Sequence, residues 1–286
     1  MRWKKGVSLG KKLIIYDLKN GTRNNLAQIG IFMLIIIIIN LLGARQITDF
    51  EHRCHLNATV LDYICFVAGG PKHIPDNMLS MYVIPVLWLL PQVMIAYIIG
   101  YYAMTDLDRY GLQVLIRSDS RIRWWISKCI WNSITVIGLY ILLYGITILV
   151  ACFNGAEKTF RLTPEIVMSL CNISNVNGSV IVHRWILLLM PILVSVSLSV
   201  FQMLFALIFS PIIGFIVSQS IVFLATIFEY KILFVNYGML SHYRLTCGSP
   251  IILRDGLLIC PLLYIGSVIA GTLFFNHYDI LPKQGD

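Results

Sequence analysis

Charge is scarce in this chain. Only 13% of its 286 residues are Asp, Glu, Lys or Arg, about half the share of a soluble domain, while 58% are hydrophobic and the mean hydropathy is +0.78. The sequence also lacks a GxxxxGK[ST] phosphate-binding loop and an HExxH zinc motif. Residues 6–10 read GVSLG, but no GxSxG is expected to serve as a nucleophile elbow. These absences argue against ATP binding by the chain itself and against the common hydrolase classes.

Six stretches carry no Asp, Glu, Lys, Arg or His at all. They cover residues 26–43, 81–103, 129–152, 185–209, 212–228 and 256–275. Each is close to the ~20 residues that a helix needs to cross the hydrocarbon core of a membrane. None alternates apolar and polar faces as the helices of a soluble core do. The sequence therefore predicts an all-α integral membrane protein with six transmembrane helices, in a single domain over residues 1–286.

Basic residues predict how these helices are oriented. They gather before the first span (Arg2, Lys4, Lys5, Lys11, Lys12, Lys19 and Arg23) and between the second and third spans (Arg109, Arg117, Arg121, Arg123 and Lys128). Cytoplasmic loops carry the excess of Lys and Arg, so both termini are expected in the cytoplasm, beneath the cell membrane. The net charge of +8 follows the membrane edge, where anionic lipid explains it better than nucleic acid does.

The segment between the second and third spans reads TDLDRYGLQVLIRSDSRIRWWISK from residue 105 to residue 128. A helix over residues 106–117 would place Asp106, Arg109, Gln113 and Arg117 on one stripe and Tyr110 on the opposite face. A partner that grips such a helix could tilt both flanking spans together. An amphipathic helix that only lies on lipid fits the same pattern.

Two groups of residues in this sequence resemble permease subunits of bacterial ABC-2-type exporters, of the kind that serves the export of bacteriocins and other antimicrobial peptides or immunity to them. The first group is Gly111, Arg117, Ser118, Ser120, Arg121, Trp124, Trp125, Ser127 and Lys128. The second, near the C-terminus, is Gly271, Phe274, Phe275, Tyr278, Asp279, Ile280 and Leu281. The six-span layout with both termini inside is similar as well.

The resemblance implies partners and roles. Two permease chains, identical or different, would pair, and each would dock a cytoplasmic ATPase subunit that binds ATP and Mg. The residues expected to contact the ATPase, on a coupling helix between the second and third spans, are Asp106, Arg109, Tyr110, Gly111, Gln113 and Arg117. Arg121 and Lys128 would orient the loop against lipid phosphate, with Trp124 and Trp125 as interface anchors. Residues 8–23 would form an elbow helix on the membrane surface.

The cysteines, the histidines and the polar residues within the spans give little evidence of a reactive or metal-binding site. Cys54 and Cys65 lie in one extracytoplasmic segment and could form a disulfide, although spacing alone does not establish the pairing. The six His lack metal-ligand spacing. Serines such as Ser195 and Ser197, with Gln202, lie at membrane depth without a His or carboxylate to activate them, so they are expected to join helices by hydrogen bonds.

The predicted function is a permease subunit of an ATP-driven exporter for an apolar or amphipathic cargo, such as a lipid or a hydrophobic peptide. The chain itself is not expected to be an enzyme or to hold a cofactor. Carriers driven by ions usually bury charged side chains in their spans, and the uncharged stretches here indicate that energy comes from a partner. The alternative is a non-transporting membrane scaffold or sensor whose extracytoplasmic loops bind a ligand.

Overall fold

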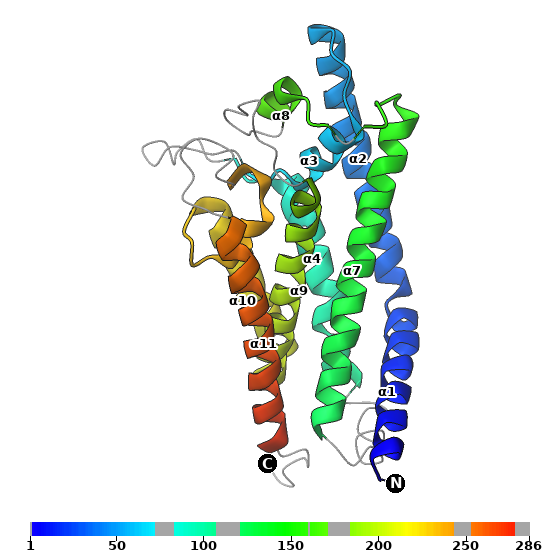
Figure 1. Cartoon of the computed structure of the whole chain (residues 1–286), viewed down its shortest axis with the longest axis vertical. Helices are drawn as coiled ribbons and strands as arrows, with labels where there is room; N and C mark the ends of the chain where they lie inside the picture. Colours follow the sequence, from blue (N-terminus) through cyan, green and yellow to red (C-terminus); the bar gives the residue numbers. More distant parts are fainter. Residues whose placement is uncertain are drawn as a thin grey trace.

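The computed structural model describes residues 2–71, 83–106, 121–159, 161–170, 184–242 and 253–277, and every named element in these ranges is helical. Figure 1 shows long helices standing side by side in one bundle. The beginning of α1 and the end of α11 lie at the same end of this bundle, here called the base (Figure 1). The opposite end carries α3 and α8 and is called the distal end.

Five helices are long and apolar enough to cross a membrane, which agrees with a multi-pass membrane protein. They are α2 (Leu26–Cys54), α4 (Val86–Gly100) continued by α5 (Tyr102–Asp106), α7 (Arg121–Phe153), α9 (Arg184–Ile208) and α11 (Leu253–His277). The apolar helix α10 (Pro211–Ile227) has 17 residues and is shorter than this criterion requires. The sixth span therefore stays a prediction.

The central helix is α9, which packs against α4, α7, α10 and α11. It is the most buried of the five long helices, and α11 is the least buried. Between α10 and α11, two short 3-10 helices, η3 (Phe234–Gly238) and η4 (Leu240–His242), fold back into the core. The large apolar faces left exposed on α2 and α11 are those that lipid would cover in a membrane.

Neutral polar side chains join the helices at membrane depth. Gln202 on α9 donates to the carbonyl of Ala96 on α4 (2.9 Å) and accepts from Ser218 on α10 (3.1 Å). Ser197 on α9 donates to the carbonyl of Cys260 on α11 (2.9 Å). These bonds confirm the expectation that serine and glutamine side chains join helices here.

The distal end is closed by two short helices, α3 (Val60–Ala68) and α8 (Pro164–Leu170). A capping box begins α3: the amide of Thr59 donates to Asp62 Oδ2 (3.0 Å), while the Thr59 side chain accepts from the amide of Asp62. Asp62 Oδ1 accepts from the amide of Thr163, just before α8 (2.9 Å). The Thr59 hydroxyl also donates to the carbonyl of Arg161 (2.5 Å). This arrangement, here called the distal cap, binds two segments about 100 residues apart in the sequence.

The N-terminal helix α1 (Arg2–Asn24) runs in nearly the same direction as α2 and lies beside the beginning of α7 (Figure 1). Leu13, Asp17 and Gly21 recur every four residues and form its buried face. The segment predicted as a surface elbow helix is therefore part of a longer helix that packs against α7.

Candidate functional site

Two buried ion pairs that share Lys128 lie at the base, where α1, α5 and α7 meet. The ammonium of Lys128 on α7 is 2.5 Å from Asp17 Oδ1 on α1 and 2.5 Å from Asp106 Oδ2 on α5. The Lys128 side chain has no solvent exposure, and those of Asp17 and Asp106 are 3% and 9% exposed. One lysine thus connects three separate helices.

Neighbouring polar and aromatic groups surround these two ion pairs. The Ser127 hydroxyl donates to Asp17 Oδ2 (2.5 Å), and the Tyr102 hydroxyl donates to Asp17 Oδ1 (3.1 Å). The ammonium lies 4.5 Å from the ring centroid of Tyr102 and 5.1 Å from that of Trp124. A buried charge is tolerated only when partners and hydrogen bonds replace water, and these groups do so. Asp17, Tyr102, Asp106, Ser127 and Lys128 are called the base network below.

The predicted lipid-facing role of Lys128, Trp124 and Trp125 is wrong in this structure, because all three side chains are at most 1% exposed. Helix α7 begins at Arg121, before the uncharged stretch, and its first turns are covered by neighbouring helices. Arg121 donates from Nη1 to the carbonyl of Asn276 (3.1 Å), in the last turn of α11. A cation at that position is favoured by the free carbonyl groups of a helix C-terminus.

Trp124 and Trp125 instead pack against α11. Trp124 stacks on Phe275 with ring centroids 4.9 Å apart, and Trp125 Nε1 donates to the carbonyl of Val268 (3.0 Å). A Cβ atom on Gly271 would come within 2.2 Å of the Trp125 ring, so only glycine admits the ring here. Trp124, Trp125, Gly271 and Phe275 are called the aromatic junction. It brings together both groups of residues that resemble exporter permeases.

A second close approach holds α1 against α7. A Cβ atom on Gly21 would lie 2.3 Å from Trp131 Nε1, and the Trp131 ring lies 3.9 Å from that of Tyr102. Tyr102, which is on α5, also donates to Asp17 on α1, so α1, α5 and α7 meet at this contact. Helix α1 is therefore part of the base and not a detached tail.

The base network lies next to the segment predicted as a coupling helix. Asp106 directly precedes residues 107–120, and Arg121 directly follows them. Arg109, Tyr110, Gly111, Gln113 and Arg117 lie outside the described residues. Asp106 was expected to contact an ATPase, but its carboxylate faces Lys128 within the bundle.

A polar hollow of about 530 Å³ borders the base network between the α1–α2 junction and α5. Asn20, Asn25, Thr105 and Asp106 are among the residues that line it. The hollow leaves space beside α5, so that α5 is not packed on every side.

The disulfide considered for Cys54 and Cys65 is not formed, and both are free thiols. Cys54 is exposed at the end of α2, whereas Cys65 is 1% exposed within α3 and faces the apolar core. The described residues include no group of His, Cys, Asp and Glu that could hold a metal ion.

In comparisons with known proteins, no family model, no curated protein sequence and no solved structure matches this chain. The resemblance to exporter permeases therefore rests on the quoted sequence motifs, and the function is argued from the base network.

Proposed function

We propose that this chain is the transmembrane permease subunit of an ATP-driven ABC exporter in the cytoplasmic membrane, with both termini in the cytoplasm. The cargo would be apolar or amphipathic, a lipid or a hydrophobic peptide. The observation that carries the proposal is the buried cluster of three charges formed by Asp17, Lys128 and Asp106. Asp106 directly precedes the predicted coupling segment. Its contact with Lys128 links α5 to α7, and the contact of Lys128 with Asp17 adds α1.

The geometry suits the transmission of force. A push on residues 107–120 would reach α5 through Asp106 and α7 through Arg121, because these residues flank the segment. Lys128 binds the two helices to each other, so they would move as one body. Asp17 would add α1 to this body, and the aromatic junction would add α11. The polar hollow beside α5 provides space for such a displacement.

The proposed partners follow from the same scheme. Each permease chain would dock one cytoplasmic ATPase, which binds ATP and Mg, and two permease chains would enclose the cargo path. The weakly buried helix α11 presents Leu258, Leu262 and Ile269, which a second copy or lipid would cover. Nucleic acid has no place in this scheme.

The test is purification of the chain from its native cells in mild detergent, followed by assay of ATP hydrolysis. We expect a soluble ATPase with a phosphate-binding loop to co-purify and to show vanadate-sensitive activity. Exchange of both Arg109→Gln and Arg117→Gln should lower recovery of the ATPase at least tenfold while the permease still inserts. The matched control is Arg254→Gln, which changes an exposed arginine in the first turn of α11, and it should retain full recovery.

The distal cap favours a second candidate, a non-transporting scaffold or sensor. Its hydrogen bonds hold two separate extracytoplasmic segments in a fixed arrangement, as a ligand-binding surface requires. A folded preparation that contains no ATPase, and in which the double arginine variant changes nothing, would favour this candidate and would contradict the permease.

A further inference from the structure

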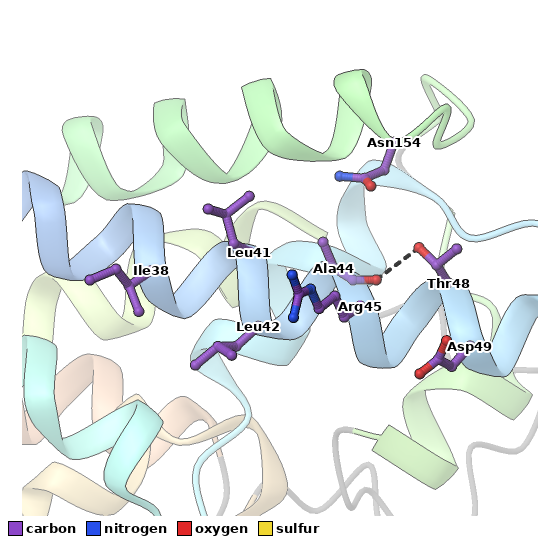
Figure 2. Close-up of a pocket in the computed structure, with 8 residues that line it drawn as sticks. All are labelled: Ile38, Leu41, Leu42, Ala44, Arg45, Thr48, Asp49 and Asn154. Carbon is purple, nitrogen blue, oxygen red and sulfur yellow. Dashed lines mark hydrogen bonds between the residues drawn. The ribbon is translucent and has the colours of Figure 1, made fainter.

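A hollow of about 530 Å³ opens on the side of α2 near the distal end. It is lined by Ile38, Leu41, Leu42, Ala44, Arg45, Thr48, Asp49 and Asn154. Asn154 approaches α2 from the end of α7, and Arg45 and Asp49 project from successive turns of α2 (Figure 2). This hollow is separate from the base network, which lies at the other end of the bundle.

The chemistry of the lining changes in a fixed order along α2. Ile38, Leu41 and Leu42 come first and are 48%, 52% and 45% exposed, then Arg45 follows, and Asp49 comes one turn later. Among the described residues, no ion pair joins the exposed side chains of Arg45 and Asp49. Both charges are therefore available to a ligand.

The position of Arg45 along α2 corresponds to the level of lipid headgroups. Helix α2 begins at Leu26, and 19 residues at about 1.5 Å each place Arg45 about 28 Å further along. That distance is close to the ~30 Å thickness of the hydrocarbon core. The apolar part of the hollow then lies beside acyl chains, and its charged part beside headgroups.

We propose that this hollow binds a phospholipid with a phosphoethanolamine headgroup, in the leaflet away from the chain termini. In such a lipid the phosphate lies between the acyl chains and the ammonium group, which is the order of Leu42, Arg45 and Asp49 along α2. The guanidinium of Arg45 binds the phosphate and the carboxylate of Asp49 accepts from the ammonium. The acyl chain lies along the three apolar residues.

The lining discriminates against other headgroups. A lipid with a net negative charge would satisfy Arg45 but would meet repulsion from Asp49. A choline group has no N–H to donate and is usually bound by aromatic rings, and no lining residue is aromatic. Ethanolamine satisfies both charges.

The test is native mass spectrometry of the full-length protein with phosphatidylethanolamine, phosphatidylglycerol and phosphatidylcholine of identical acyl chains. We expect the wild type to retain phosphatidylethanolamine about fivefold more than either other lipid, the effect of one interfacial charge contact. Asp49→Asn leaves Arg45 alone and should reverse the preference toward phosphatidylglycerol. Arg45→Gln should lower retention of both. Lys158→Gln removes an exposed charge elsewhere at the distal end and should change nothing.

Equal retention of the three lipids by the wild type would overturn the proposal. So would an unchanged preference in Asp49→Asn, which would assign lipid selectivity to another surface. A second copy of the chain seated on α2 would shield both charges and would also give no selectivity. None of these outcomes depends on ATPase recovery, so this inference and the permease proposal can fail separately.

Discussion

The two ends of the bundle bury carboxylates by different means. At the base, Asp17 and Asp106 face the ammonium of Lys128, and the network joins three helices by charge. At the distal cap, Asp62 has no solvent exposure, and the hydrogen bonds described for its carboxylate come from Thr59 and Thr163. Burial raises the pKa of Asp62 above its ordinary value of 3.8, and hydrogen bonds from Thr163 and Thr59 offset this only in part.

This contrast separates two ways of making a helix junction. Removal of one partner from a buried charge pair leaves uncompensated charge in a low-dielectric region and strongly destabilises the fold. A buried carboxylate that is held by amide and hydroxyl donors has no counter-charge. When burial raises its pKa, as at Asp62, its contribution to stability changes with pH. The base therefore depends on the presence of all three charges, whereas the stability of the distal cap depends on pH.

The largest effect should come from removal of the lysine at the base. Lys128→Met leaves Asp17 and Asp106 buried without a counter-charge and should lower the free energy of unfolding by about 3–5 kcal/mol. Unfolding in detergent, followed by tryptophan fluorescence, measures this. The exposed Lys158→Met is the control and should unfold like the wild type.

A further variant distinguishes charge from packing at the base. Combining Lys128→Met with Asp17→Asn and Asp106→Asn removes every charge and should recover part of the lost stability. If Lys128→Met alone unfolds at the wild-type midpoint, the ion pair does not hold the base together.

A smaller effect is expected from wedging α1 away from α7. Gly21→Leu forces Trp131 to move, because even a Cβ atom would lie 2.3 Å from Trp131 Nε1, and should cost about 1–3 kcal/mol. Gly30→Leu and Gly138→Leu are matched controls, since a Cβ atom at either position meets nothing within 4 Å. The same unfolding assay applies, and equal midpoints for all three variants would contradict the close contact.

The smallest effect concerns pH at the distal cap. Because the folded pKa of Asp62 is raised, its contribution to stability is complete below pH 3.8 and is lost as the pH rises through the folded value. The cap should therefore open more often at higher pH. Asp62→Asn removes this dependence, and it also weakens the cap because an amide cannot accept every bond.

Cys65, which is one turn after Asp62 and buried, reports on this opening through its rate of alkylation, read by peptide mass spectrometry. The alkylation rate of Asp62→Asn divided by that of the wild type should be largest near pH 4 and fall severalfold toward pH 8. Exposed Cys54 serves as the internal control for the reactivity of the reagent at each pH. A ratio that stays constant with pH would show that Asp62 does not titrate during opening.

Hydropathy was sufficient to predict the long helices but not their charged ends. The third predicted span began at residue 129 because a charged residue ends an uncharged stretch, whereas α7 continues back to Arg121. Burial of Lys128 depends on Asp17, which lies 111 residues away in the sequence, and no local periodicity reveals such a pairing. The available signal was the four-residue spacing of Leu13, Asp17 and Gly21, with the only acid of a basic segment at its centre.

The aromatic junction also has a consequence for the order in which the protein can assemble. Trp125 precedes Val268, to which it donates, by 143 residues. At about 5–20 residues per second, roughly 7–30 seconds of synthesis separate the appearance of these two residues. During that interval Trp124 and Trp125 lack the helix that later covers them, and they are exposed to lipid or to whatever escorts the nascent chain. The base is therefore completed late in biogenesis, and a chain that is interrupted before α11 leaves Trp124 and Trp125 uncovered.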